Sequence, residues 1–342
     1  MSEPLCPACH GACSSVPLRR FDSRAAAQHF VLREEFPQVH AELVQHIRSL
    51  WGGEGCDLHA CSACGLQFAW PFVAGDGRFY NLAYPYSSYP SERWEFEQSL
   101  QALARTPLPP GPVLEIGSGS GQFLRKLSPR FVAPHDVLSI EFNDTARQQL
   151  QAMGFQTFAA DVRSDAFANL RGSLQAVFMF QVLEHLDGLD ALTERLDTLL
   201  APGASVHVAV PNIERIDHAE AHGGLLDMPP NHISRWTEGA FRALAARAGW
   251  TLCDWRVEPA GWRNFVKIDL INSHMRRAQR SGSLANLARG RRRTPARVAV
   301  EGVLALAAAP ARLPGWIKAA PKRRSLGDSV WLRLRKPGAT GA

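Results

Sequence analysis

Short apolar runs alternate with longer polar stretches between residues 113 and 211. The five runs begin near residues 113, 137, 155, 176 and 204. The run at 176–185 is continuous rather than alternating, as expected for a strand that is covered on both faces. The stretches between the runs, such as 189–200, are compatible with helices. This alternation predicts a doubly wound α/β sheet.

The first run leads into a glycine-rich turn, Val-Leu-Glu-Ile-Gly-Ser-Gly-Ser-Gly at 113–121. Gly117, Gly119 and Gly121 let the backbone bend sharply and approach a ligand without a Cβ atom in the way. The spacing departs from the dinucleotide fingerprint Gly-x-Gly-x-x-Gly, and Glu115 would repel a pyrophosphate but attract an ammonium group. S-adenosylmethionine carries an ammonium and a sulfonium group, so the turn suits this ligand better than NAD.

Two further acids follow apolar runs at intervals that suit the same ligand. Glu141 ends the second run, where a carboxylate can accept hydrogen bonds from both ribose hydroxyls. Asp161 ends the third run and can meet the adenine amino group while Val162 packs on the ring. Each signal alone could be a plain strand-end acid or turn glycine, but their number and order favour a cofactor site.

With these motifs in place, residues 95–258 resemble the class I S-adenosylmethionine-dependent methyltransferases, and the resemblance resumes at residue 327. It implies a Rossmann-like seven-stranded sheet in which 327–336, which alternates like a strand with one wet face, is the closing antiparallel strand. The predicted cofactor-binding residues are Glu115, Gly117, Ser118, Gly119, Gly121, Glu141, Phe142, Asn143, Asp161, Val162, Gln181 and Val182.

Two histidines are candidate catalytic bases. His185 ends the fourth run beside Glu184, which could orient or charge it. By resemblance, this pair could instead pin the cofactor loop or, as in quinone-pathway enzymes, help to bind a divalent ion. His232 follows two prolines in a loop that leads to a predicted helix at 238–248, and similar methyltransferases carry a Pro-x-His segment over the acceptor pocket. Its alternative role is a hydrogen bond that holds the loop.

Two Cys-x-x-Cys pairs at the front of the chain predict a metal site. Cys6, Cys9, Cys61 and Cys64 offer the four sulfurs of a tetrahedral zinc site. His10, Cys13 and Cys56 are alternative ligands, and a redox pair or unliganded thiols are alternative interpretations. A helix-like segment at 25–50 separates the pairs. The segment resembles the zinc-bearing front of bacterial methyltransferases of natural-product and surface-polysaccharide pathways, which implies a structural zinc.

Composition and the first residues of the chain predict its net charge and its cellular compartment. The chain has 46% hydrophobic residues, a formal charge of +6 and a pI near 9.1, with much of the basic excess between residues 276 and 335. Its start lacks the basic and apolar regions of a signal peptide, which predicts a cytoplasmic protein. Seven cysteines argue against a disulfide framework.

The basic excess lies mostly in a predicted insertion at 259–326. Basic clusters at 289–293 and 322–324 bracket an apolar stretch, 298–317, which prolines and charges make a poor spanning helix. Residues 289–324 could contact an anionic membrane surface from its cytoplasmic side or cover an acidic substrate. The alternative is a solvated helix that packs on the domain or on a second copy.

These features predict a zinc module at 1–94 with a helical excursion, a methyltransferase domain at 95–258, the insertion, and a closing strand and tail at 327–342. The predicted activity is methyl transfer to a small molecule, sugar or glycan, to oxygen rather than carbon. An RNA methyltransferase is one alternative, but the 181–185 segment lacks the Asn/Asp-Pro-Pro-Tyr/Phe signature of exocyclic-nitrogen methylation, so nucleic acid is not the expected partner. A scaffold with a vestigial methyltransferase fold is the non-enzymatic alternative.

Overall fold

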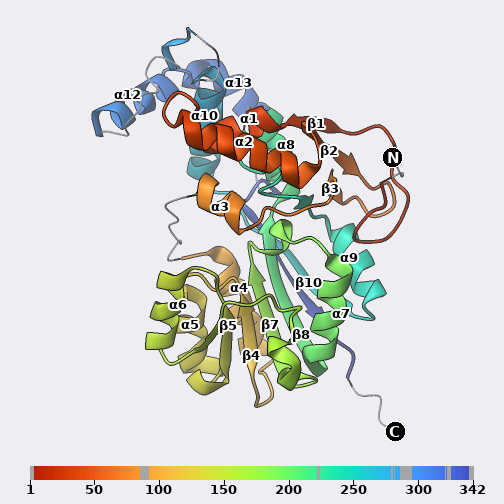
Figure 1. Ribbon diagram of the computed structural model, residues 1–342. Coiled ribbons are helices and arrows are strands. Elements are labelled where there is room, and N and C mark those ends of the chain that lie inside the picture. Colours follow the sequence, from red (N-terminus) through yellow and green to blue (C-terminus); the bar gives the residue numbers. More distant parts are fainter. Residues whose placement is uncertain are drawn as a thin grey trace.

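A seven-stranded sheet forms the centre of the computed structural model, which describes residues 4–84, 92–221, 224–278, 280, 282–285, 295–319, 321 and 325–338. The strand order is β10-β11-β8-β7-β4-β5-β6 (Figure 1). The strands are β4 (Val113–Ile116), β5 (Val137–Ile140), β6 (Gln156–Phe158), β7 (Leu174–Phe180), β8 (Leu200–Pro211), β10 (Thr251–Val257) and β11 (Ser329–Arg335). Because β11 runs antiparallel between β8 and β10, the predicted sheet and its closing strand are confirmed.

Apolar side chains cover both faces of this sheet. In β7, Val177 and Met179 join one core while Phe178 and Phe180 join the other. The first core is closed by α7 (Leu189–Leu199) and α9 (Glu238–Arg247). The second is closed by α4 (Trp94–Arg105), α5 (Gln122–Phe131) and α6 (Asp144–Ala152). The continuous apolar run of the sequence is thus a strand buried on both sides.

A second, four-stranded antiparallel sheet forms the front of the chain, in the order β1-β2-β3-β9. Its strands are β1 (Arg19–Asp22), β2 (Gly55–Ala60), β3 (Gln67–Trp70) and β9 (Ser234–Arg235). The last strand comes from the segment after β8, so the N-terminal module is completed by residues far along the chain. The helix-like segment at 25–50 is two helices, α1 (Ser23–Phe30) and α2 (Pro37–Trp51), and α3 (Gly77–Ala83) follows.

Four helices complete the upper part of Figure 1. They are α8 (Ile213–Ala221), α10 (Trp262–Ala278), α12 (Pro295–Leu306) and α13 (Ala309–Ala319). His218 lies within α8. The apolar stretch at 298–317 forms parts of two helices, with Pro314 inside the second. The basic clusters at 289–293 and 322–324 lie outside the described residues.

Three short 3₁₀ segments connect elements of the main sheet: η1 (Pro134–Asp136), η2 (Asp165–Leu170) and η3 (Leu183–His185). The last follows β7 at the carboxyl end of the parallel strands, where ligands of doubly wound sheets bind. Among the described helices, none is long and apolar enough to cross a bilayer.

Candidate active site

The glycine turn after β4 adopts left-handed backbone conformations. Gly117, Gly119 and Gly121 have φ values of 76°, 51° and 76°. A Cβ atom on Gly117 would lie 2.5 Å from Val182 Cγ2, and one on Gly121 would lie 2.6 Å from Leu150 Cδ2. Both the conformation and the space therefore demand glycine at these two positions. The turn fits tightly between β7 and α6.

Two buried carboxylates flank this turn. Glu115 is 2% exposed, its Oε2 atom has no hydrogen-bond partner among the described residues, and burial raises the pKa of its carboxyl group well above the ordinary value. Glu141 instead accepts hydrogen bonds from the main-chain N–H groups of Gly119 at 2.7 Å and Asn143 at 2.8 Å. The unpartnered oxygen of Glu115 suits a cationic ligand.

A pocket of about 120 Å³ lies over the turn. Its lining residues are Arg93, Phe96, Glu115, Gly117, Ser118, Gly119, Ser120, Gln122, Phe180 and Gln181. Gln181 has a φ of 58°, unusual for a residue with a side chain, and its amide donates to Ser329 Oγ at 3.2 Å and to Glu95 Oε1 at 3.4 Å. Arg93, which no motif of the sequence marks, adds a cation between α4 and the turn.

The remaining predicted cofactor residues have other contacts. Asp161 accepts two hydrogen bonds from the Arg163 guanidinium, at 2.9 and 2.6 Å. Val162 is 4% exposed within the first core, whereas Phe142 is 67% exposed. The Asn143 side chain caps α6 by accepting from the Ala146 N–H group at 3.0 Å. None of these side chains lines the 120 Å³ pocket, so their contacts with a cofactor stay predictions.

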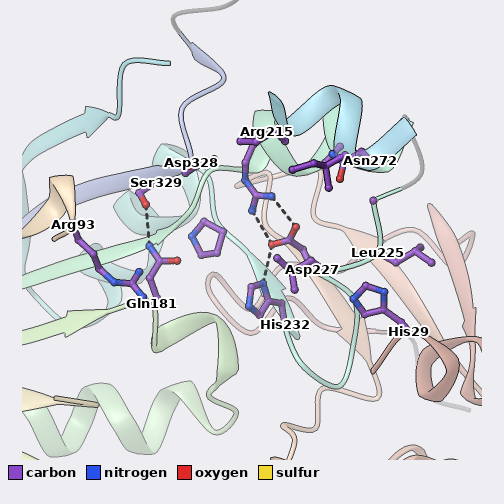
Figure 2. Close-up of a pocket in the computed structure, with 16 residues that line it drawn as sticks. His29, Arg93, Gln181, Arg215, Leu225, Asp227, His232, Asn272, Asp328 and Ser329 are labelled. Atoms are coloured by element: carbon purple, nitrogen blue, oxygen red, sulfur yellow. Dashed lines mark hydrogen bonds and ion pairs between the residues drawn. The ribbon is translucent and has the colours of Figure 1, made fainter. Parts of the chain in front are cut away.

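A larger pocket of about 440 Å³ adjoins the first one, and Arg93 and Gln181 line both (Figure 2). Its other walls include His29 from α1, Arg215 from α8 and Asn272 from α10. The N-terminal module, the main sheet and the insertion therefore share one cavity. Leu225, Leu226, Ile268 and Ile271 supply apolar surface to it.

His232 lies in the wall of this larger pocket and contacts a buried carboxylate. Its Nδ1 atom is 3.1 Å from Asp227 Oδ1, and the Arg215 guanidinium donates to both oxygens of Asp227, at 3.0 and 2.8 Å (Figure 2). Burial alone would raise the pKa of Asp227, but His232 and Arg215 together lower it below the ordinary value. A carboxylate that is stabilised in its charged form therefore lies beside His232. No motif of the sequence marks Asp227 or Arg215.

His185 is placed differently from the expectation. Its Nδ1 atom lies 2.6 Å from the Asn231 carbonyl oxygen, which can only accept, so Nδ1 carries the proton; the Tyr80 hydroxyl is 2.9 Å away. Glu184 Oε1 is 3.8 Å from Nε2, too far for the predicted orienting hydrogen bond. Burial, followed by the charge of nearby His232, lowers the pKa of His185 to about 3. His185 does not line the larger pocket, whereas His232 does, and the catalytic role of either histidine stays a prediction.

Glu184 is fully buried, and neither carboxylate oxygen has a hydrogen-bond partner among the described residues. Burial raises the pKa of its carboxyl group to about 8. Ligand atoms of Glu184, His185 and His232 all lie within 4.8 Å of one another, a spacing that could hold a metal ion. The alternative of a helper ion at the Glu-His pair therefore has a geometric basis.

Comparison with known protein families identifies the central part of the chain. Residues 91–254 match the family model described as a methyltransferase domain. The match covers 164 of the 342 residues, a little under half of the chain, and makes this part of the chain similar to a methyltransferase domain. Among curated proteins, no sequence matches the chain.

Solved structures described as methyltransferases show weak similarity to this chain. An S-adenosylmethionine-dependent methyltransferase from Mesorhizobium loti is 14% identical, with a TM-score of 0.42 over 72% of this chain and 100% of that one. One from Archaeoglobus fulgidus is 15% identical, with a TM-score of 0.40 over 70% and 94%. Phosphoethanolamine N-methyltransferase 2 from Haemonchus contortus, in complex with S-adenosyl-L-methionine, is 16% identical, with a TM-score of 0.41 over 70% and 52%. Similarities at this level indicate no acceptor.

The four paired cysteines converge in front of the methyltransferase domain. The Sγ atoms of Cys6 and Cys64 are 3.5 Å apart, those of Cys9 and Cys61 are 3.4 Å apart, and all four lie within 4.8 Å of one another. Zinc with bonds of about 2.3 Å to four sulfurs would hold them about 3.8 Å apart. The sulfur positions fit a tetrahedral zinc ion.

The backbone of both cysteine pairs has the same turn. His10 and Gly65, each directly after the second cysteine of its pair, have φ values of 60° and 80°. Their N–H groups donate to the carbonyl oxygens of Cys6 and Cys61, each at 2.8 Å. The sequence marks only the second turn, through Gly65, because His10 adopts the left-handed conformation without being glycine.

The alternative ligands have other surroundings. His10 Nε2 lies 3.0 Å from an oxygen of Asp190. Cys13 Sγ donates to the Gly11 carbonyl oxygen at 3.6 Å, and Cys56 is buried in the core of the N-terminal module. Cys13 also lies beside the cluster, since it interacts with Cys61, but Cys6, Cys9, Cys61 and Cys64 are the four whose sulfur atoms converge, and zinc at them stays a prediction.

Replacing Glu184 by glutamine should flatten the pH dependence of stability. The carboxyl pKa is about 8 in the folded protein against an ordinary 4.5, so folding requires proton uptake between these values. Stability of the parent protein should fall across that window as the pH rises, by up to roughly 1.4 kcal/mol per pH unit. Thermal denaturation at pH 5 and pH 8 measures this difference, which we expect to shrink in Glu184→Gln. An unchanged difference, or an equal shrinkage in the surface control Glu238→Gln, would contradict the prediction.

Proposed function

We propose that the protein is a methyltransferase that transfers the methyl group of S-adenosylmethionine to a small molecule, sugar or glycan, at oxygen rather than carbon. The observation that supports this most is the pair of adjoining pockets, one over the glycine turn and one lined by His232, which share Arg93 and Gln181. Cofactor and acceptor would meet at these two residues.

Several groups of the smaller pocket fit the proposed cofactor, which supplies an electrophilic methyl group when bound. The unpartnered Glu115 carboxylate matches its ammonium group, and Arg93 matches its carboxylate. Gly119 lines the pocket, and Glu141, which lies beside the turn and accepts hydrogen bonds from two main-chain N–H groups, would meet the ribose hydroxyls. Burial of Glu115 makes its pairing with a cation favourable, because the charged carboxylate is otherwise costly.

The larger pocket supports an acceptor of small size. Its volume of about 440 Å³ lies within the usual range of small-molecule sites, and three parts of the chain enclose it. Asp227 holds Nδ1 of His232, so Nε2 is the nitrogen left to take a proton from an acceptor hydroxyl. An acceptor with a hydroxyl group beside an apolar portion would suit His232 together with Leu225 and Ile268.

The cysteine cluster supports a structural zinc. All four ligand positions would be filled by sulfur, which leaves none for water. The cluster also contacts the methyltransferase domain, since the Thr237 hydroxyl donates to the Cys64 carbonyl oxygen at 2.8 Å and Arg247 donates to the Ala8 carbonyl oxygen at 2.7 Å. Both residues belong to α9 or its cap, so zinc would hold the module against this helix.

Gly119→Val should abolish cofactor binding and leave the protein folded. A side chain at this position would occupy the ligand side of the turn. Isothermal titration with S-adenosylmethionine and S-adenosylhomocysteine should show saturable binding to the parent protein and none to the variant. Gly172→Val is a matched control, because Gly172 has positive φ as Gly119 does. Gly172 has open space around it and lies away from both pockets. Equal affinity in Gly119→Val would refute the cofactor site.

His232→Ala should lower kcat by about 100-fold or more while the cofactor dissociation constant stays unchanged. Asp227→Asn should lower kcat less, because His232 stays in place but the charge beside it is lost. Methyl transfer to a panel of nucleotide sugars, glycans and hydroxylated small molecules measures both variants, with His135→Ala as the exposed control. Full turnover in His232→Ala would return this residue to a structural role. Cofactor binding without transfer to any acceptor would favour the scaffold, and transfer to RNA would favour the RNA alternative.

Purified protein should contain one zinc ion per chain by elemental analysis. Cys61→Ser should lose the metal and lower the melting temperature, because binding energy of a structural zinc is folding energy. Cys253→Ser removes an exposed thiol outside the cluster and should retain the ion. Metal-free protein after zinc-supplemented expression, with an unchanged melting temperature in Cys61→Ser, would rule the site out.

A further inference from the structure

The net positive charge of the insertion exceeds the net charge of the whole protein. Residues 259–326 contain 15 basic and 2 acidic residues, while the complete chain has a formal charge of +6, so the rest is net negative. One of the two acids, Asp269, is 1% exposed and buried in internal contacts. Glu301 is the other. The charged residues of the insertion are therefore almost all basic.

Aliphatic side chains on α12 and α13, which belong to this basic segment of the sequence, are exposed. Val300, Val303 and Leu306 are 50%, 65% and 62% exposed, and Leu313 and Ile317 are 51% and 66% exposed. Spacings of three and four residues place those of each helix on one side. We call these five residues the α12–α13 face. In Figure 1 both helices lie at the end of the molecule remote from the main sheet.

Internal contacts hold these two helices on α10. Arg312 of α13 donates to both oxygens of Asp269, at 2.9 and 2.6 Å, and the Trp316 indole N–H donates to Asp269 at 2.7 Å. Arg277 of α10 donates to the Leu304 carbonyl oxygen of α12 at 3.2 Å. Since the polar anchors and Trp316 face inward, the aliphatic residues point outward. Their exposure thus results from how the helices are anchored.

We propose that the α12–α13 face docks on an anionic lipid bilayer. A basic surface with aliphatic side chains lies in the plane of a membrane interface, where the aliphatic groups enter the acyl boundary and the cations meet the headgroups. Two copies of the face would bring like charges together, which disfavours self-association. Nucleic acid would satisfy the charge but leaves exposed valine and leucine without apolar partners.

Docking would place the acceptor pocket beside the membrane. Ile268, Ile271 and Asn272 of α10 line the 440 Å³ pocket, and α10 is the helix that carries α12 and α13. Ile271 and Leu226 in the pocket wall are 48% and 53% exposed. The pocket wall therefore has exposed apolar side chains, one of them on the helix that carries α12 and α13. This inference does not depend on the chemistry of the reaction.

Co-sedimentation of the full chain with vesicles tests the proposal. Vesicles of phosphatidylcholine with about one-third phosphatidylglycerol should bind the protein, pure phosphatidylcholine should bind it at least roughly tenfold more weakly, and added salt should release it. The double variant Val303→Glu, Leu306→Glu should reduce binding by roughly tenfold or more. The matched control Val16→Glu, Leu18→Glu changes two exposed apolar residues of the N-terminal module and should bind as the parent does.

Three results would overturn the proposal. Equal binding to neutral and anionic vesicles, or none to either, would exclude an anionic bilayer. A change of oligomeric state in the α12–α13 double variant, measured by light scattering, would show that a second copy covers the face. Tighter binding to an RNA probe than to anionic vesicles at the same salt, lost in the double variant, would identify a nucleic acid instead. Titration with S-adenosylmethionine should give the same affinity in all these variants, which separates this test from that of the proposed function.

Discussion

The close approach of the glycine turn to the end of β7 is the constraint on which the site depends. Because Gly117 has no side chain, the backbone of the turn can lie directly against Val182 after the end of β7. The space between Gly117 and Val182 is too small for a Cβ atom. This approach sets where Glu115 enters the small pocket and where Gly119 meets the Glu141 carboxylate. A side chain at Gly117 would push the turn away and misplace both carboxylates. The cofactor geometry is thus a consequence of backbone packing.

The larger pocket depends on buried charge rather than on backbone shape. Arg215 and Asp227 have side chains only 15% and 3% exposed, and removing either partner would leave the other charge uncompensated. The pair joins α8 to the loop before β9, and that loop carries His232. Because β9 also completes the N-terminal sheet, the front module and the candidate base are positioned by the same segment. The front module therefore helps to shape the wall of the larger pocket.

Periodicity in the sequence predicted the sheet because each of its strands is a local pattern. The runs at 113–116 and 176–180, the closing strand and each of the two cysteine pairs follow from residues that are near one another in sequence. Arg93 and Asp227 escaped prediction because their roles arise only when distant segments meet. The adjacent Glu184 and His185 looked like a functional pair, yet backbone geometry leaves them 3.8 Å apart and hydrogen-bonds His185 to Asn231 instead. Adjacency in sequence does not determine where two side chains point.

Gln181 links the two pockets and is held in a costly conformation. Left-handed backbone at a residue with a side chain costs of order 1 kcal/mol or more, and it persists only where surrounding contacts impose it. Here the main-chain N–H group of Gln181 donates to Ala209 of β8, and its amide donates to Ser329 of β11. Since β11 returns to the sheet only after the insertion, the last strand of the fold fixes the residue that lines both pockets. The insertion therefore adds a surface to the domain, and β11 still joins the sheet beside Gln181.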